Sequence, residues 1–291
     1  MFDPLSKLGL GTAQFRLEPG GGMRGRTPEA EVSEILGIAS RSGLDVLDTA
    51  AAMNGVETAV GQGLPRPNPF RVMVKTLRAD RGADWVEDQL RASLLRLGVT
   101  HADAVIVQSA GELCGPHGEA VWDRLRTLCD EGLFRAMGVS VYASDDPLGI
   151  ARRFKPDIVQ APASLLDQRL LVDGTLATLK ELGIEVQLRS IFLQGLLFLP
   201  PDRLPGALKG AAASRLSRVR RMIAEGRSDP LQAALGFALS RPEASSVIVS
   251  VTSAAELSAV VAAAMSPPPD LDWDEMAMDD PVALDPRRWV A

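Results

Sequence analysis

Short apolar runs alternate with amphipathic segments of helical period along most of the chain. The runs predict strands at Lys7–Thr12, Asp45–Asp48, Arg71–Thr76, Asp103–Gln108, Ala136–Ser140, Ile158–Ala161, Glu185–Ser190 and Ser246–Ser250. The segments between and after them predict helices at Pro28–Ser42, Val56–Gly63, Trp85–Leu97, Glu119–Asp130, Pro147–Arg153, Gly174–Leu182, Pro230–Ser240 and Ala254–Ala264. This alternation predicts an α/β fold, a parallel (β/α)8 TIM barrel in a single domain.

A doubly wound sheet is the rival fold, but the first strand lacks the glycine-rich turn that such sheets use. Gly9-Leu10-Gly11 continues as Thr-Ala-Gln rather than as a dinucleotide-binding fingerprint. The stretch Ala207–Glu225 predicts one extra helix, inserted after the seventh strand. Left-handed glycine stops are expected after four of the helices, at Gly43, Gly98, Gly132 and Gly183.

The composition is typical of a globular protein that acts on small molecules. The chain has 291 residues, a formal charge of −6 and 46% hydrophobic residues, so it can bury a large core. We expect a small-molecule substrate and no nucleic-acid partner, because no basic stripe occurs. Cys114 and Cys129 have no metal-ligand spacing, and neither a leader nor a membrane-spanning run is evident. These features predict no bound metal, no membrane association, a cytoplasmic location, and a monomer or small homo-oligomer.

The negative charge is concentrated at the C-terminus. We therefore divide the chain into a barrel at 1–265 and a proline-rich acidic segment at 266–291, which we expect to be extended. Trp273 and Trp289 indicate that this segment packs on the barrel, either over the mouth or along the outside. If it covers the mouth, its carboxylates should disfavour phosphorylated substrates.

Two charged residues end apolar strands, Asp48 on the second and Lys75 on the third. In barrels of this kind the chemistry lies at the carboxyl ends of the strands. Because a buried charge is costly unless it is paired, we expect an ion pair between these two side chains. A purely structural pair at the barrel rim is the alternative.

Several short motifs, in order along the chain, resemble the aldo-keto reductase family. They are Gly9–Thr12, Leu47–Ala50, Val74–Thr76, Gly138–Ser140 and Ile248–Ser250, and Arg189–Leu197 is similar to a bacterial subgroup. The resemblance implies a (β/α)8 barrel that reduces carbonyl compounds with NADPH and has no Rossmann domain.

The resemblance also implies a catalytic tetrad of Asp, Tyr, Lys and His, of which this chain keeps half. Asp48 and Lys75 match, whereas Met53 stands at the tyrosine position and Gln108 at the histidine position. Neither a thioether nor an amide can act as the proton donor. Tyr142 or His117 could replace the missing acid, although ordinary packing or loop roles are the simpler interpretation of both.

The same resemblance implies a cofactor, NADPH or NADH, with weakened contacts. Arg189 stands where a ring usually stacks on the nicotinamide, and no cation is found where the adenosine 2′-phosphate would bind. The implied cofactor-binding residues are Thr12, Ser140, Gln160, Arg189, Ser190, Ser250, Thr252 and Ser253.

Three functions follow from these residues. The first is NAD(P)H-dependent reduction of a small or sugar-type carbonyl compound. The second is a catalytically degenerate barrel that binds a ligand, and the third is non-redox proton transfer by Asp48 and Lys75.

Overall fold

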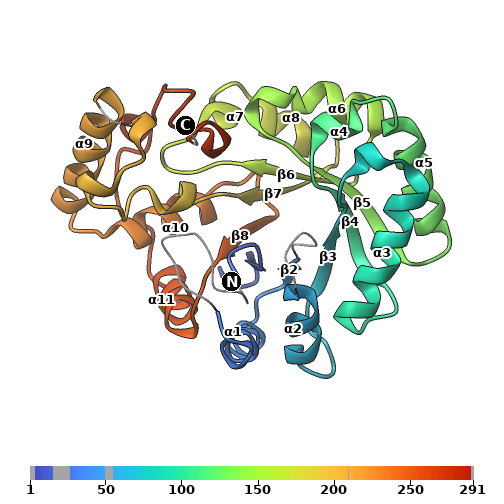
Figure 1. Cartoon of the computed structure of the whole chain (residues 1–291). Coiled ribbons are helices and arrows are strands. Elements are labelled where there is room, and N and C mark those ends of the chain that lie inside the picture. The colour runs from blue at the N-terminus through green and yellow to red at the C-terminus, as the bar shows by residue number, and fades with distance from the viewer. Residues whose placement is uncertain (1–3, 16–26, 50–54, 209, 290–291) are drawn as a thin grey trace.

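Eight parallel strands close into a barrel in sequence order (Figure 1). The computed structural model describes residues 4–15, 27–49, 55–208 and 210–289. The strands are β1 (Leu8–Gly11), β2 (Val46–Asp48), β3 (Arg71–Lys75), β4 (Ala102–Val107), β5 (Phe134–Ser140), β6 (Ile158–Pro162), β7 (Glu185–Arg189) and β8 (Ser246–Ser250). The predicted (β/α)8 barrel is confirmed, and each strand lies within two residues of its predicted bounds.

Helices surround the barrel (Figure 1). They are α1 (Glu29–Arg41), α2 (Val56–Gly63), α3 (Ala83–Leu97), α4 (Ala110–Leu113), α5 (Gly118–Asp130), α6 (Pro147–Phe154), α7 (Arg169–Val172), α8 (Thr175–Glu181), α9 (Ala211–Glu225), α10 (Pro230–Leu239) and α11 (Ala254–Met265). The four glycine stops all have positive φ, between 65° at Gly98 and 82° at Gly132. The sequence analysis did not predict α4 and α7, because a single turn has too few residues to show a helical period.

The inner face of the barrel is apolar in its middle layer and glycine-rich on β1. Val46, Met73, Ala104, Ile106 and Ile158 form a buried cluster inside the strands. A Cβ on Gly11 would lie 2.7 Å from the Ser250 Oγ atom and one on Gly9 would lie 2.9 Å from the Val46 Cβ atom. Because the inward positions of β1 are glycines, the side chains of the neighbouring strands fill the space beside it.

The insertion helix α9 and the C-terminal segment pack together beside the barrel (Figure 1). Met276, Met278 and Leu284 are buried in a second hydrophobic cluster with residues of α9 and of the loops after β6 and β7. Arg215 of α9 donates to the carbonyl oxygens of Glu275 and Ala277. The segment that we expected to be extended also contains two short 3₁₀ turns, at Asp274–Met276 and Pro286–Arg288.

Two kinds of feature are absent from the described residues. No helix among them combines the length and the apolar character needed to cross a membrane. No group of three or more His, Cys, Asp or Glu side chains among them is arranged to hold a metal ion.

Candidate active site

Asp48 and Lys75 form a buried ion pair at the carboxyl ends of β2 and β3. The Lys75 Nζ atom donates to the Asp48 Oδ2 atom at 2.5 Å, and the two side chains are only 8% and 7% exposed. The other carboxylate oxygen, Oδ1, accepts from the Gln160 Nε2 atom at 2.8 Å. Because an ammonium group has three N–H donors, Lys75 can still donate to a ligand while it holds Asp48.

Gln160 of β6 links this ion pair to the barrel interior. Its Nε2 atom also donates to the Gln187 Oε1 atom of β7 at 3.0 Å, and both glutamines are 0% exposed. The Gln160 Oε1 atom is buried and has no hydrogen-bond partner in the described part of the chain. Ser140, the predicted companion of Gln160, is buried and opposite it in the β5–β6 register. A buried, unused acceptor therefore lies beside Asp48.

The structure locates one of the two substituted tetrad positions. Gln108 is exposed directly after β4, and its backbone N–H donates to the Thr76 hydroxyl at 3.2 Å. Met53 lies outside the described residues. Thr12, which was predicted to contact the cofactor, is buried beyond the end of β1 and donates its backbone N–H to the Asp48 carbonyl oxygen.

Two arginine side chains lie over the ring of Tyr142, one of the two candidate replacements for the missing acid. The Arg189 guanidinium lies 4.4 Å from the centroid of its ring, and that of Arg287 in the C-terminal segment lies 3.5 Å from it. His117, the other candidate, is exposed immediately before α5. Among the described residues, no hydrogen bond or ion pair joins either side chain to Asp48 or Lys75.

Arg189 ends β7 as a cation without a carboxylate partner among the described residues. It donates to the Val141 carbonyl oxygen at 2.6 Å and to the Ser190 hydroxyl at 3.2 Å, while its Nε atom is buried and unpaired. Burial lowers the pKa of Arg189 from its ordinary value. The loop that follows contains three non-glycine residues with positive φ, Ser190, Leu193 and Gln194. Each such conformation costs roughly 1–3 kcal/mol, and strain of this kind clusters at functional sites.

Carboxylates occupy the N-terminus of α11, where the predicted residues Ser250, Thr252 and Ser253 lie. The Glu256 carboxylate accepts from the backbone N–H and the hydroxyl of Thr252, and Ser253 caps the Glu256 N–H. Glu31 of α1 accepts from the Ala254 N–H at 2.6 Å. The sequence analysis missed Glu31. A phosphate at this helix end would have to compete with these two carboxylates.

The sequence analysis also missed Glu185 and Gln187, although β7 contained a signal for them. Polar residues alternate with apolar ones along Glu185–Arg189, and Glu185, Gln187 and Arg189 therefore share the inward face of the strand. Of the three, only Arg189 was predicted as a site residue, because it lies at the carboxyl end of the strand.

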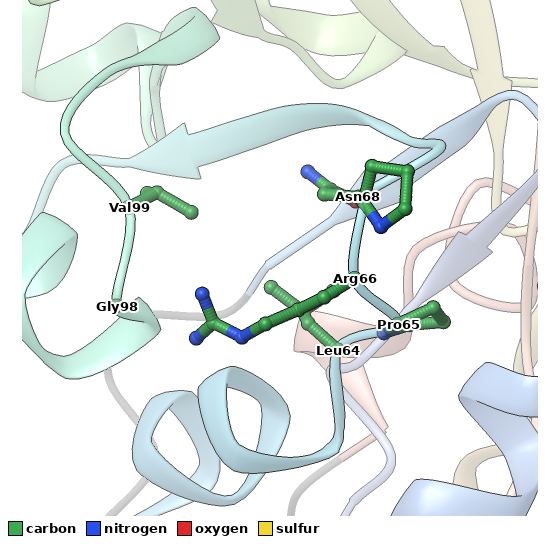
Figure 2. A pocket seen from close by; sticks show the side chains of 7 residues that line it. Leu64, Pro65, Arg66, Asn68, Gly98 and Val99 are labelled. Carbon is green, nitrogen blue, oxygen red and sulfur yellow. The ribbon is translucent and has the colours of Figure 1, made fainter.

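A small cavity of about 150 Å³ lies away from this site (Figure 2). It is lined by Leu64–Asn68, which connect α2 to β3, and by Gly98 and Val99 before β4. These connections lie at the amino ends of the strands. That end of a (β/α)8 barrel serves stability rather than chemistry, so we assign no activity to this cavity.

The fold and the ion pair place the protein among the (β/α)8-barrel proteins whose functional site lies at the carboxyl ends of the strands. The chain belongs to the aldo/keto reductase family, whose model matches residues 7–278.

Individual relatives match smaller parts of the chain. An aldo-keto reductase of Mycolicibacterium vanbaalenii is 34% identical over 135 residues, which cover 44% of this chain and 47% of that protein. One from Mycobacterium sp. (strain MCS) is 34% identical over 122 residues, covering 40% and 41%. The chain thus spans about half the length, or less, of these relatives.

Among solved structures, the holo form of aldo-keto reductase AKR11C1 from Bacillus halodurans superimposes with a TM-score of 0.75. It is 22% identical, and the alignment covers 93% of this chain and 89% of that one. At this identity the likeness concerns the fold.

Proposed function

We propose that the protein reduces a small or sugar-type carbonyl compound with NADH or NADPH at the carboxyl ends of the strands. The observation that carries this proposal is the buried Asp48–Lys75 pair at the ends of β2 and β3. Family membership supports the reaction class. The pair is half of the tetrad that the family resemblance implies.

The residues at the nicotinamide end fit such a cofactor. The unpaired Gln160 Oε1 atom offers a buried acceptor for a carboxamide N–H, and Ser140 lies opposite Gln160 in the register. The adenosine end differs, because Glu31 and Glu256 occupy the start of α11. We therefore expect no preference for the 2′-phosphate of NADPH over NADH.

The cofactor, when bound, supplies a hydride to the carbonyl carbon. The chain has to stabilise the charge that develops on the carbonyl oxygen, and Lys75 is the group placed to do so. Asp48 holds the ammonium group in position. With Met53 and Gln108 at the other tetrad positions, the proton comes from Lys75 or from a water molecule bound to it.

Titration of the purified protein with NADH and NADPH, followed by nucleotide fluorescence, tests the proposal. We expect both to bind with affinities within about threefold of each other. The absence of binding at millimolar nucleotide would refute the proposed cofactor. A panel of aldehydes and sugars then tests turnover, and the double variant M53Y/Q108H should gain aldehyde reduction if only the acid is missing.

A second function, ligand binding without turnover, is favoured by the positions of Tyr142 and His117. Neither side chain reaches the ion pair in the described structure, so no conventional acid stands beside it. In that case the nucleotide binds, but no carbonyl compound in the panel is reduced.

A further inference from the structure

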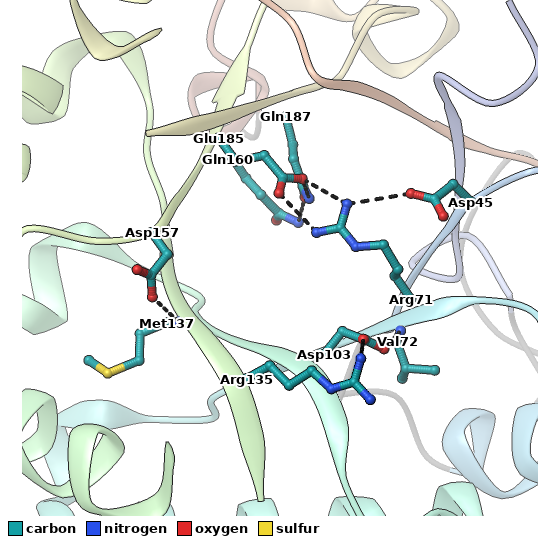
Figure 3. A network of polar contacts seen from close by, with 10 residues as sticks. All are labelled: Asp45, Arg71, Val72, Asp103, Arg135, Met137, Asp157, Gln160, Glu185 and Gln187. Carbon is teal, nitrogen blue, oxygen red and sulfur yellow. Dashed lines mark hydrogen bonds and ion pairs between the residues drawn. The ribbon is translucent and has the colours of Figure 1, made fainter. Parts of the chain in front are cut away.

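A continuous column of polar side chains runs through the barrel from its amino end to Asp48. Arg71 of β3 reaches across to β7, where both of its Nη atoms donate to the Glu185 carboxylate, at 3.2 and 2.8 Å (Figure 3). The Gln187 Nε2 atom donates to the Glu185 Oε1 atom at 2.8 Å. Gln160 follows, and it donates to both Gln187 and Asp48.

The chemistry of the two ends fixes the direction of every hydrogen bond in this column. An ionised carboxylate only accepts and a guanidinium only donates. Glu185, paired with Arg71, therefore requires the NH2 group of Gln187, which turns the Gln187 oxygen toward Gln160. Gln160 must then offer its own NH2 group. Asp48, which is paired with Lys75, likewise accepts a hydrogen bond from the Gln160 NH2 group.

A primary amide has two N–H donors, and Gln160 spends both of them on these two acceptors. Its oxygen is left buried without a partner among the described residues. A buried acceptor without a hydrogen bond is destabilising. It persists here because the two carboxylates, Glu185 and Asp48, require the NH2 groups of the glutamines and leave no N–H to donate to the Gln160 oxygen.

We propose that Glu185 and Gln187 are positioning residues that keep the Gln160 oxygen free to accept a hydrogen bond from a ligand N–H donor. Glu185 does so from the opposite end of the barrel. That the ligand is the carboxamide of a nicotinamide nucleotide rests on the proposed function.

The variant Glu185→Gln (E185Q) reverses the column. Arg71 can only donate, so the introduced amide turns its oxygen to Arg71 and its NH2 group to Gln187. Gln187 then rotates and presents its NH2 group to Gln160. Gln160 has to turn its oxygen toward that group while its own NH2 group keeps the bond to Asp48, so the acceptor is filled from within the protein.

Asp103 offers a matched control. It also lies at the amino end of the barrel, accepts from an arginine (Arg135) and the Val72 N–H, and is 21% exposed where Glu185 is 24% exposed. It makes no hydrogen bond to either glutamine.

The first measurement needs no ligand. In ¹⁵N–¹H spectra, with the Gln160 side-chain signals assigned by their loss in Gln160→Met, both amide protons of Gln160 should be protected from exchange in the native protein. In E185Q one of them should lose its hydrogen bond and exchange faster, whereas D103N should leave both protected. Unchanged Gln160 protons in E185Q, or an equal change in D103N, would overturn the proposal.

The second measurement compares NAD⁺ with its 3-acetylpyridine analogue, which has a methyl group in place of the amide NH2. E185Q should weaken NAD⁺ binding by about 3- to 10-fold, the worth of one neutral hydrogen bond, and should leave the analogue unaffected. Equal weakening of both nucleotides would show that Glu185 acts only on the fold. If native protein binds neither nucleotide, the proposed function fails, and the exchange measurement alone decides the role of Glu185.

Discussion

Removal of the Lys75 ammonium group should destabilise the protein more than the loss of any exposed ion pair. In Lys75→Met (K75M) the Asp48 carboxylate stays buried, and among the described residues its one remaining side-chain hydrogen bond comes from Gln160. Breaking a buried pair by removing one partner typically costs about 3–5 kcal/mol, because the other charge is left uncompensated.

The geometry supports the same range. At 2.5 Å and an effective dielectric constant of about 20, the attraction between Lys75 and Asp48 is roughly 6–7 kcal/mol. The methionine is spared the desolvation penalty of the lysine, which offsets part of this loss. We therefore expect the free energy of unfolding to fall by about 3–5 kcal/mol, a large part of the roughly 5–15 kcal/mol that stabilises a typical domain.

Urea unfolding at pH 7 provides the assay, and Arg126→Met provides the control. Arg126 pairs with Asp123 at 2.7 Å, but the two side chains are 56% and 69% exposed, so that variant should lose no more than about 1 kcal/mol. The double variant D48N/K75M should recover part of the stability, because no buried charge is then left alone. If K75M lowered the free energy of unfolding by no more than R126M does, the claim that the Asp48–Lys75 pair is desolvated would be refuted.

Two further predictions concern packing and pH. Gly61→Ala should lower the free energy of unfolding by about 1–3 kcal/mol, because its Cβ would lie 2.5 Å from the Arg96 carbonyl oxygen. In Gly37→Ala the Cβ meets only a flexible side chain, so the free energy of unfolding should rise by about 0.5–1 kcal/mol. Thermal unfolding of both variants tests this, and equal effects would contradict it. The hydrogen bond from Arg287 holds the pKa of Asp285 below its ordinary value of 3.8, so the stability that this carboxylate contributes is present above that pH and is lost as the pH falls through the lower, folded-state value. Fluorescence of the tryptophans in the C-terminal segment should follow this loss in the native protein. It should show no such step in D285N, and a step unchanged in D285N would assign the transition to another group.

The sequence was sufficient for the fold because each strand, and each helix longer than a single turn, carries its own local signal. The predicted strand at Ser246–Ser250 and the predicted helix at Val56–Gly63 have the observed bounds. Apolar runs and glycine stops act over a few residues, and the pairing of consecutive parallel strands follows from the alternation itself.

The site was predictable only where a charge interrupts an apolar strand. Asp48 and Lys75 fulfil this condition, and their pairing is observed. The alternation along β7 places Glu185 and Gln187 on its inward face, but their hydrogen bonds depend on β3, β6 and β7 coming together across the barrel, and no local pattern predicts that pairing. Arg287 on Tyr142 and Glu31 at α11 are contacts between residues more than a hundred positions apart, and only the closed barrel brings them together.

The number of carboxylates in the C-terminal segment does not by itself describe the charge around the Tyr142 ring. Seven carboxylates near the mouth would repel an anionic substrate if they were free. In the structure Asp285 pairs with Arg287 and Glu275 pairs with Arg218, while Asp280 caps the Val282 and Ala283 N–H groups. The side chain that reaches Tyr142 from this segment is cationic, and Arg189, which also lies over this ring, has no hydrogen bond or ion pair to a carboxylate among the described residues. Cationic groups as well as carboxylates therefore lie at this end of the barrel, and substrate panels for this protein should include anionic compounds beside neutral sugars.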